Sequence, residues 1–139
     1  MKALILIDFA ILISISLLHF YWALGGKWAS QSVLPMKKNG LPVFKPGVFV
    51  TLLVAFGLLI FALLILANLE MFSQIIALQF LGPLTWLVAI IFLIRAFGDF
   101  RFVGFSKRIK NTTFSRKDSL YYSPLSLLIG MISLLIAIF

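Results

Sequence analysis

Cysteine is absent from this 139-residue chain, and side chains that bind metals are scarce. Without cysteine there can be no disulfide, thiolate nucleophile, iron–sulfur cluster or cysteine-ligated zinc. The remaining titratable ligands are His19, Asp8, Glu70, Asp99 and Asp118. They are too few for a metal site built from protein side chains, and a single histidine offers at most one axial ligand to a haem. The sequence therefore predicts no metal and no cofactor.

Charge is also sparse, because only 12% of the residues are charged while 63% are hydrophobic. Four apolar stretches approach the roughly 20 residues that a helix needs to cross a bilayer, namely Ala3–Leu24, Val48–Ala67, Ile75–Phe97 and Pro124–Phe139. The first is about twice as long as the hydrophobic region of a signal peptide, so we expect it to be retained. We predict an all-α membrane protein, a single domain over residues 1–139 that forms a bundle of four transmembrane helices.

The basic residues are distributed unevenly between the connections. The first connection holds Lys27, Lys37, Lys38 and Lys45, and the third, with its flanks, holds Arg95, Arg101, Lys107, Arg108, Lys110, Arg116 and Lys117. The second connection, near residues 68–73, has only Glu70 as a charged residue. Because lysine and arginine favour cytoplasmic loops, we expect both basic connections in the cytoplasm and both termini outside.

This orientation fits a bacterial cytoplasmic (inner) membrane, and it accounts for the net charge of +8. Basic residues that flank apolar spans attract the anionic lipids of the inner leaflet. We therefore expect membrane lipids as partners and no nucleic acid.

The third connection, Gly98–Tyr122, interleaves aromatic and basic residues. On a helix, Phe102, Phe105 and Ile109 would form an apolar stripe, which is typical of a segment lying in the headgroup plane. An ordinary basic loop that follows the topology rule is the alternative. Arg95 lies in the last turn of the third span and Asp99 follows four residues later, so we expect an Arg95–Asp99 ion pair, with a ligand-binding arginine as the alternative.

The first span carries two polar residues on one face, His19 and Asp8. They lie three turns apart, about 16 Å by helix rise, so they cannot form a dyad. His19 shares its face with Trp22 and is either a hydrogen-bonded packing residue or a group that titrates near neutrality. Asp8 is expected to be solvated or bonded to another helix.

The predicted topology brings many polar side chains to the cytoplasmic ends of the helices. Ser123 is expected to cap the fourth helix, whose free N–H groups after Pro124 would favour an anion. The candidate ligand-binding residues are His19, Tyr21, Trp22, Arg95, Asp99, Arg101, Lys107, Arg108, Asp118, Tyr122 and Ser123. The leading hypothesis is a site for an anionic amphiphile or lipid headgroup, with a phosphate or carboxylate held by arginine.

Three runs carry a resemblance to a known family: LHFYWALGGKW (Leu18–Trp28), GDFRFVGFSKR (Gly98–Arg108) and YYSPL (Tyr121–Leu125). They resemble a bacterial family of small four-helix membrane proteins catalogued as a domain of unknown function. The resemblance implies the same architecture and no particular activity. The positions that match the family pattern are His19, Tyr21, Trp22, Gly25, Gly26, Arg95, Gly98, Asp99, Arg101, Gly104, Lys107, Arg108, Asp118, Tyr122, Ser123 and Pro124.

Two further hypotheses come from other functional classes. A small membrane enzyme would act on a lipid-like substrate, with His19 or Asp99 as general acid/base and Arg95 or Arg101 stabilising negative charge. That enzyme needs His19 and Asp99 within reach of one ligand. An accessory subunit would instead pack its apolar faces against a larger membrane complex or a second copy of itself. Neither a catalytic role nor the oligomeric state follows from the sequence.

Overall fold

The computed structural model describes residues 1–70 and 77–139, and these residues contain four long apolar helices. They are α1 (Lys2–Ala23), α2 (Val48–Leu66), α3 (Leu78–Phe97) and a final continuous helix made of α4 (Thr113–Lys117), the π-helical η3 (Asp118–Tyr122) and α5 (Ser123–Ile138). A short 3₁₀ turn, η1 (Ser30–Ser32), lies in the first connection. Each of the four is long and apolar enough to cross a membrane. The predicted all-α protein with four membrane-spanning helices is confirmed.

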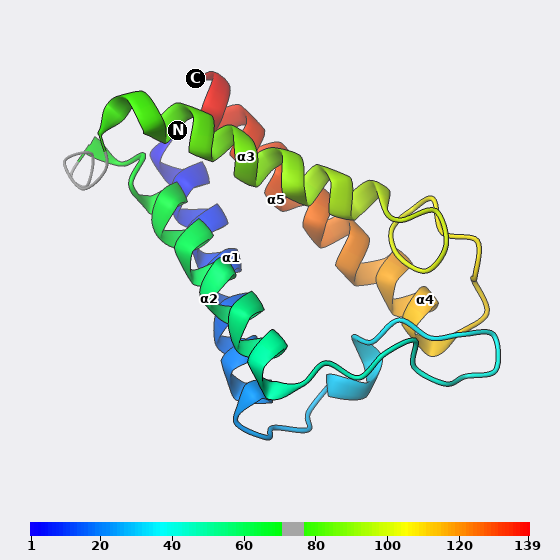
Figure 1. Cartoon of the computed structure of the whole chain (residues 1–139). Helices are drawn as coiled ribbons and strands as arrows, with labels where there is room; N and C mark the ends of the chain where they lie inside the picture. The colour runs from blue at the N-terminus through cyan, green and yellow to red at the C-terminus, as the bar shows by residue number, and fades with distance from the viewer. Residues whose placement is uncertain (71–76) are drawn as a thin grey trace.

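The helices associate as two pairs, α1 with α2 and α3 with α5 (Figure 1). In the first pair, the Ser16 hydroxyl donates a 2.7 Å hydrogen bond to the backbone carbonyl of Ala55. In the second pair, a side chain at Gly130 would come within 2.8 Å of Leu93, so glycine allows the close approach of α3 and α5. Gly130 thus serves packing within the bundle.

The two pairs lie close together near the chain termini and diverge toward the other end (Figure 1). We call the first the termini end and the second, which carries the first and third connections, the connection end. Two side-chain hydrogen bonds join the pairs near the termini end, from Ser133 to Asp8 at 2.7 Å and from Asn68 to Thr85 at 3.1 Å. Asp8 is fully buried and bonded to α5. Of the two alternatives expected for it, the bond to another helix is therefore confirmed and solvation is not.

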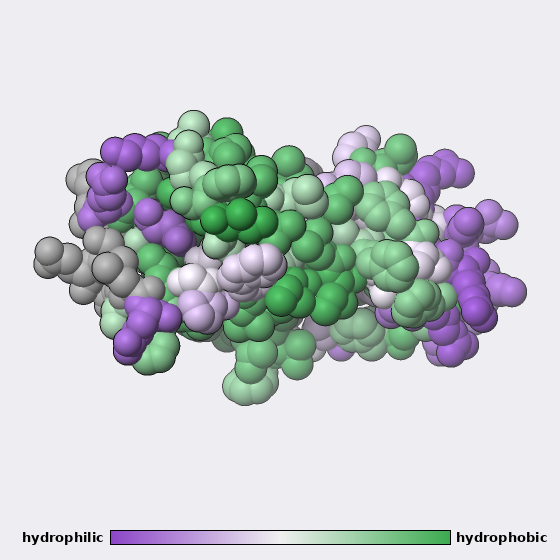
Figure 2. Space-filling model, turned by 90° about the horizontal axis from the view of Figure 1, so that it is seen from above, coloured by the Kyte–Doolittle hydropathy of each residue, from purple (hydrophilic) through white to green (hydrophobic). Residues whose placement is uncertain are grey.

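One apolar core is shared by all four long helices. Its buried members are Ile5, Leu12, Ala62, Leu64, Ile65, Val88, Phe92, Ile129, Ile132 and Ile136. Many other large apolar side chains point outward, and Figure 2 shows them covering the middle of the molecule while hydrophilic residues gather at its two ends. An apolar belt between two polar ends is the surface that a bilayer covers.

The fourth helix begins earlier than the sequence predicted. Thr112 caps it at its N-terminus in a reciprocal capping box with Ser115, and the helix continues through the π turn into α5. The expectation that Ser123 caps a helix starting at Pro124 is wrong, and so is the expectation of free N–H groups there. The wider π turn lies directly before Pro124, where a regular helix would bring the proline ring against the carbonyl of Leu120.

The third helix begins at Leu78, after the predicted start at Ile75. Residues 71–76, which include that predicted start, lie outside the described residues.

Candidate functional site

The loop from Gly98 to Gly104 leaves α3 in a tightly wound conformation. One carboxylate oxygen of Asp99, Oδ1, accepts three hydrogen bonds of 2.7–2.9 Å from the backbone amides of Arg101, Phe102 and Val103. Burial would raise the pKa of Asp99, but these amide bonds outweigh it and hold the pKa below its ordinary value. The two glycines have φ of 102° and 84°, and a side chain on either would collide with the backbone of the same loop.

The predicted interfacial helix over Phe102–Ile109 is therefore wrong. Residues 99–111 form no helix, because Asp99 and the two glycines direct the backbone into a loop at its start. This part of the third connection is irregular backbone that ends at the Thr112 cap.

A second carboxylate, Asp118, is fully buried in the π turn and is held by two basic side chains. The Lys107 ammonium and the Arg95 guanidinium each approach it at 3.0 Å. The Gly104 amide donates a 2.8 Å bond and the Ser123 hydroxyl a 3.0 Å bond to the same carboxylate. We call these five residues the buried ionic network. Such a pair is stable in an apolar setting only when further hydrogen bonds satisfy it, as they do here.

The expected Arg95–Asp99 ion pair is thus wrong. Arg95 bonds to Asp118, which lies 23 residues further along the chain, while Asp99 binds the amides of its own loop. The spacing of four residues would place both groups on one helical face only if the helix continued, but α3 ends at Phe97. The Nη1 atom of Arg95 is buried and has no hydrogen-bond partner among the described residues.

Lys107 has no donor left for a ligand. Its ammonium group bonds to the Gly104 carbonyl at 2.9 Å and to the Ser119 hydroxyl at 2.7 Å, in addition to Asp118. These three bonds use the three donors of a lysine. Of the sequence candidates, Lys107, Asp118 and Ser123 therefore serve the fold, because all three are buried and Asp118 accepts a hydrogen bond from each of the other two.

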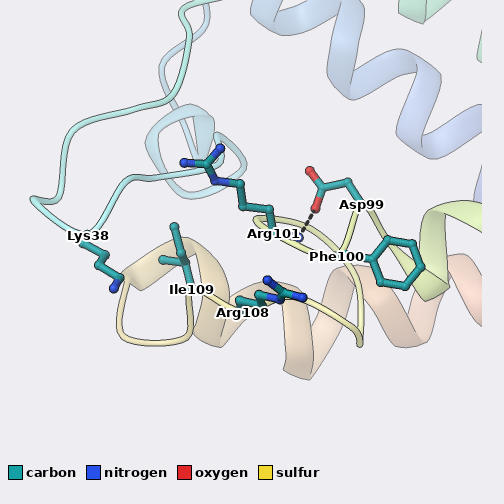
Figure 3. Close-up of a pocket in the computed structure, with 6 residues that line it drawn as sticks. All are labelled: Lys38, Asp99, Phe100, Arg101, Arg108 and Ile109. Carbon is teal, nitrogen blue, oxygen red and sulfur yellow. Dashed lines mark hydrogen bonds between the residues drawn. The ribbon is translucent and has the colours of Figure 1, made fainter.

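An open cavity of about 510 Å³ lies beside the Gly98–Gly104 loop, and we call it the basic pocket (Figure 3). Its lining residues are Lys38, Asp99, Phe100, Arg101, Arg108 and Ile109. Lys38 comes from the first connection and the others from the third, so the pocket forms only when the two connections meet. Phe100 has a φ of 63°, a conformation that is costly for a bulky residue and is typically found at functional sites.

The three cations of the basic pocket are exposed and not engaged by acids. Among the described residues, the side chains of Lys38, Arg101 and Arg108 make no ion pair or hydrogen bond, and the Arg101 guanidinium lies only over the Phe102 ring, 5.0 Å from its centre. The pocket has a single acid, Asp99, and one of its two carboxylate oxygens accepts three backbone amide bonds. The pocket thus presents a surplus of positive charge with free donors.

Lys38 was not among the residues that the sequence singled out. It lies in an irregular turn, where Met36 and Pro42 form an isolated bridge and the Lys37 amide donates to the Leu41 carbonyl. Neither periodicity nor a motif marks such a position. Only its place among basic residues of the first connection was a signal.

His19, Tyr21 and Trp22 form a separate group on α1. The His19 ring bonds through Nδ1 to the Ile15 carbonyl at 2.8 Å and lies edge-on to Trp22, with ring centres 5.0 Å apart. Trp22 donates a 2.8 Å bond to the Trp28 carbonyl, and the Trp28 amide donates a 3.4 Å bond to the Tyr21 hydroxyl. These bonds fasten the first connection to α1. The packing interpretation of His19 agrees with this geometry.

Tyr122 links the two connections. Its hydroxyl lies 3.2 Å from the hydroxyl of Ser32 in η1, and its ring packs against Phe114 of α4. The sequence candidates thus divide between the buried ionic network, the basic pocket, the α1 group and this link. The structure does not bring them to one point.

The chain belongs to the family described as "Protein of unknown function (DUF3995)", whose model matches residues 12–133. The match runs from the middle of α1 into α5 and includes both the buried ionic network and the basic pocket. It confirms the expected membership of a family of unknown function. Comparison with curated proteins and with solved structures finds no match.

Proposed function

We propose that this membrane protein binds the phosphate-bearing headgroup of an anionic amphiphile in the basic pocket. The observation that carries the proposal is the set of three unpaired cations, Lys38, Arg101 and Arg108, around one open cavity. The planar guanidinium group of arginine matches the oxygens of a phosphate. Each charged hydrogen bond between them contributes about 1.5–3 kcal/mol to binding. A phosphate in the pocket would accept hydrogen bonds from the donors that the protein leaves unused.

An apolar strip beside the pocket suits the tail of such a ligand. Phe100 lines the pocket and lies edge-on to Phe97 at the end of α3, with ring centres 5.5 Å apart. Phe97, Ile94 and Ile90 follow at spacings of three and four along the helix, and all are exposed. The strip leads from the pocket along the surface of α3 into the apolar belt, which favours an amphiphile over a free anion.

The enzyme hypothesis lacks its catalytic pair. The basic pocket contains Asp99 but not His19, which belongs to the other helix pair and bonds to its own helix. Asp99 Oδ1 is already an acceptor for three amides, so it is a poor proton acceptor. Binding is therefore the activity that the geometry supports best.

The proposal includes an orientation, with the connection end in the cytoplasm of a bacterial cell and the protein in its inner membrane. Eleven of the twelve basic residues lie in or beside the first and third connections, which together form the connection end. A topology reporter fused after Phe139 should then read as external. A cytoplasmic reading would place the basic pocket outside and contradict this part of the proposal.

The test of binding is native mass spectrometry on the protein in phosphatidylcholine nanodiscs that contain a minor fraction of phosphatidylglycerol. Wild type should retain phosphatidylglycerol. The Arg101→Ala, Arg108→Ala variant should retain it at least about tenfold less, because the loss of even one charged hydrogen bond costs about a factor of ten. The matched control is Lys110→Ala, Arg116→Ala, which removes the same charge from exposed residues outside the pocket.

Equal losses in the pocket variant and the control would show general surface attraction and overturn the site. A wild type that shows no preference for phosphatidylglycerol would overturn the function itself. Co-purification with other membrane proteins in that case would favour the accessory-subunit hypothesis.

A further inference from the structure

A second open cavity, of about 420 Å³, lies at the connection end between the first connection and α4. Its lining residues are Lys27, Ala29, Gln31, Ser32, Met36, Thr113 and Lys117. No acid is among them. The two lysines come from opposite walls, and neither ammonium group has an ion pair or hydrogen bond among the described residues. We call this cavity the lysine pocket.

The lysine pocket shares two features with the basic pocket. Each is built from both connections, and each has in its wall a non-glycine residue with positive φ, Ala29 at 58° and Phe100 at 63°. Within the described part of the chain these are the two non-glycine residues with that backbone conformation. Strain of this kind persists only where the surrounding structure holds it, which is characteristic of binding sites.

The two pockets adjoin along one turn of the first connection. Met36 lines the lysine pocket and Lys38 lines the basic pocket, and two residues span at most about 7 Å. The turn between them is fixed by the bridge from Met36 to Pro42 and by the 3.0 Å bond from the Gly40 amide to the Lys37 carbonyl. On the other wall, Ile109 and Thr113 are four residues apart. Groups bound in the two pockets would therefore be neighbours.

We propose that the two pockets together bind one amphiphile that carries two phosphate groups joined by a short linker. This inference rests on the proposed function of the basic pocket and names the ligand class. The basic pocket takes one phosphate through arginine, and the lysine pocket takes the other through Lys27 and Lys117, with Gln31 and Thr113 as neutral polar groups in the wall. The ligand is a two-headed phospholipid such as diphosphatidylglycerol.

A ligand with two linked phosphates gains affinity because its second group binds from a high effective concentration. A single-phosphate lipid has no such gain, even when two molecules supply the same charge. The discriminating measurement is thus the preference for one diphosphatidylglycerol over two phosphatidylglycerols. We expect wild type to prefer diphosphatidylglycerol by about tenfold or more per phosphate in phosphatidylcholine nanodiscs.

Two double variants separate this inference from the proposed function. Lys27→Ala, Lys117→Ala should abolish the preference for diphosphatidylglycerol while one phosphatidylglycerol still binds. Arg101→Ala, Arg108→Ala should weaken the binding of both lipids. The control Lys110→Ala, Arg116→Ala, which removes equal charge outside both pockets, should keep the wild-type preference.

A wild type without the preference, or a Lys27→Ala, Lys117→Ala variant that keeps it, would overturn the two-phosphate inference and leave the basic pocket intact. If the Arg101→Ala, Arg108→Ala variant bound both lipids as wild type does, the proposed function would be overturned instead. Glycerol 1,3-bisphosphate, the soluble headgroup fragment, should compete only at concentrations at least about a hundredfold higher, because it lacks the tails. Competition at equal concentration would overturn the amphiphile as ligand.

Discussion

The buried ionic network and the basic pocket use the same residue types in opposite ways. Each contains one aspartate and at least two basic side chains, and both draw on the third connection. In the network, the bases surround the carboxylate of Asp118 and all three donors of Lys107 are used. In the pocket, backbone amides bond to one oxygen of Asp99, and the bases make no ion pair among the described residues. What a carboxylate binds thus decides whether nearby cations serve the fold or a ligand.

The strongest test of this comparison is Asp118→Asn. It should lower the free energy of unfolding in detergent by about 3–5 kcal/mol, because it leaves a buried lysine without its counter-charge. Asp99→Asn is the matched change in the other region and should cost far less, since an amide oxygen still accepts from backbone amides. Denaturant titration of both variants measures the difference. Equal losses would mean that the two carboxylates have equivalent structural roles.

Gly104→Ala should affect both regions at once. Gly104 donates to Asp118 and also closes the loop that carries Phe100 and Arg101, and its φ is 84°. A left-handed conformation for alanine, a weakened charged hydrogen bond and the collision of the new side chain with the Gly98 backbone together cost at least about 2–4 kcal/mol. Lipid retention should fall with stability. Gly57→Ala is the control, because a side chain there meets nothing within 4 Å and alanine favours helix. A Gly104→Ala protein that is stable and binds lipid would refute the link between the regions.

Salt should affect lipid binding in the basic pocket more than the stability that comes from the buried ionic network. Raising sodium chloride from about 50 mM to about 500 mM shortens the screening length and should weaken phosphatidylglycerol retention several-fold, because the pocket cations are exposed. The thermal midpoint should change little, because Asp118 and Lys107 of the network are buried. The measurement pairs lipid retention with thermal unfolding at each salt concentration. If the midpoint fell as steeply as retention, the network would be solvated.

The smallest expected effect is the pH dependence due to Asp99. Its folded pKa lies below the ordinary value of 3.8, so its contribution to stability is fully present above that value and is lost as pH falls through the folded pKa. The free energy of unfolding of wild type should therefore exceed that of Asp99→Asn by a constant amount from pH 7 to about pH 5. Below about pH 4 this difference should shrink. A difference that changes near neutrality would contradict the conclusion that backbone amide bonds lower the pKa of Asp99.

The membrane-spanning helices were predictable because length and hydropathy determine them locally. The tertiary partners were not. Arg95 had an acid four residues away, yet it binds one 23 residues away, because the chain turns at Gly98. Local spacing rules apply only while a helix continues. The turn itself had a visible signal, since two glycines enclose an aspartate that can accept amide bonds.

The start of the fourth helix shows a second limit of sequence reasoning. Ser123-Pro124 has the composition of a helix start, but the helix enters it already formed, from the π turn at Asp118–Tyr122. The turn also brings the Ser123 hydroxyl within 3.0 Å of the Asp118 carboxylate, although the two residues are five positions apart. No periodicity in the sequence announces a π turn, so the position of Asp118 at the centre of the network came only with the structure.

The hydrogen bond between Asp8 and Ser133 has a consequence for how the protein is made. Its two residues are 125 positions apart, so the first helix enters the membrane before its partner is synthesised. A carboxyl group held in the bilayer without this bond is costly, and the arrival of the last helix lowers that cost by bonding one of its two oxygens. Docking of the two helix pairs through this bond therefore has to wait until α5 has been synthesised. A product truncated before Ser133 would lack the hydrogen bond to Asp8 in its first span.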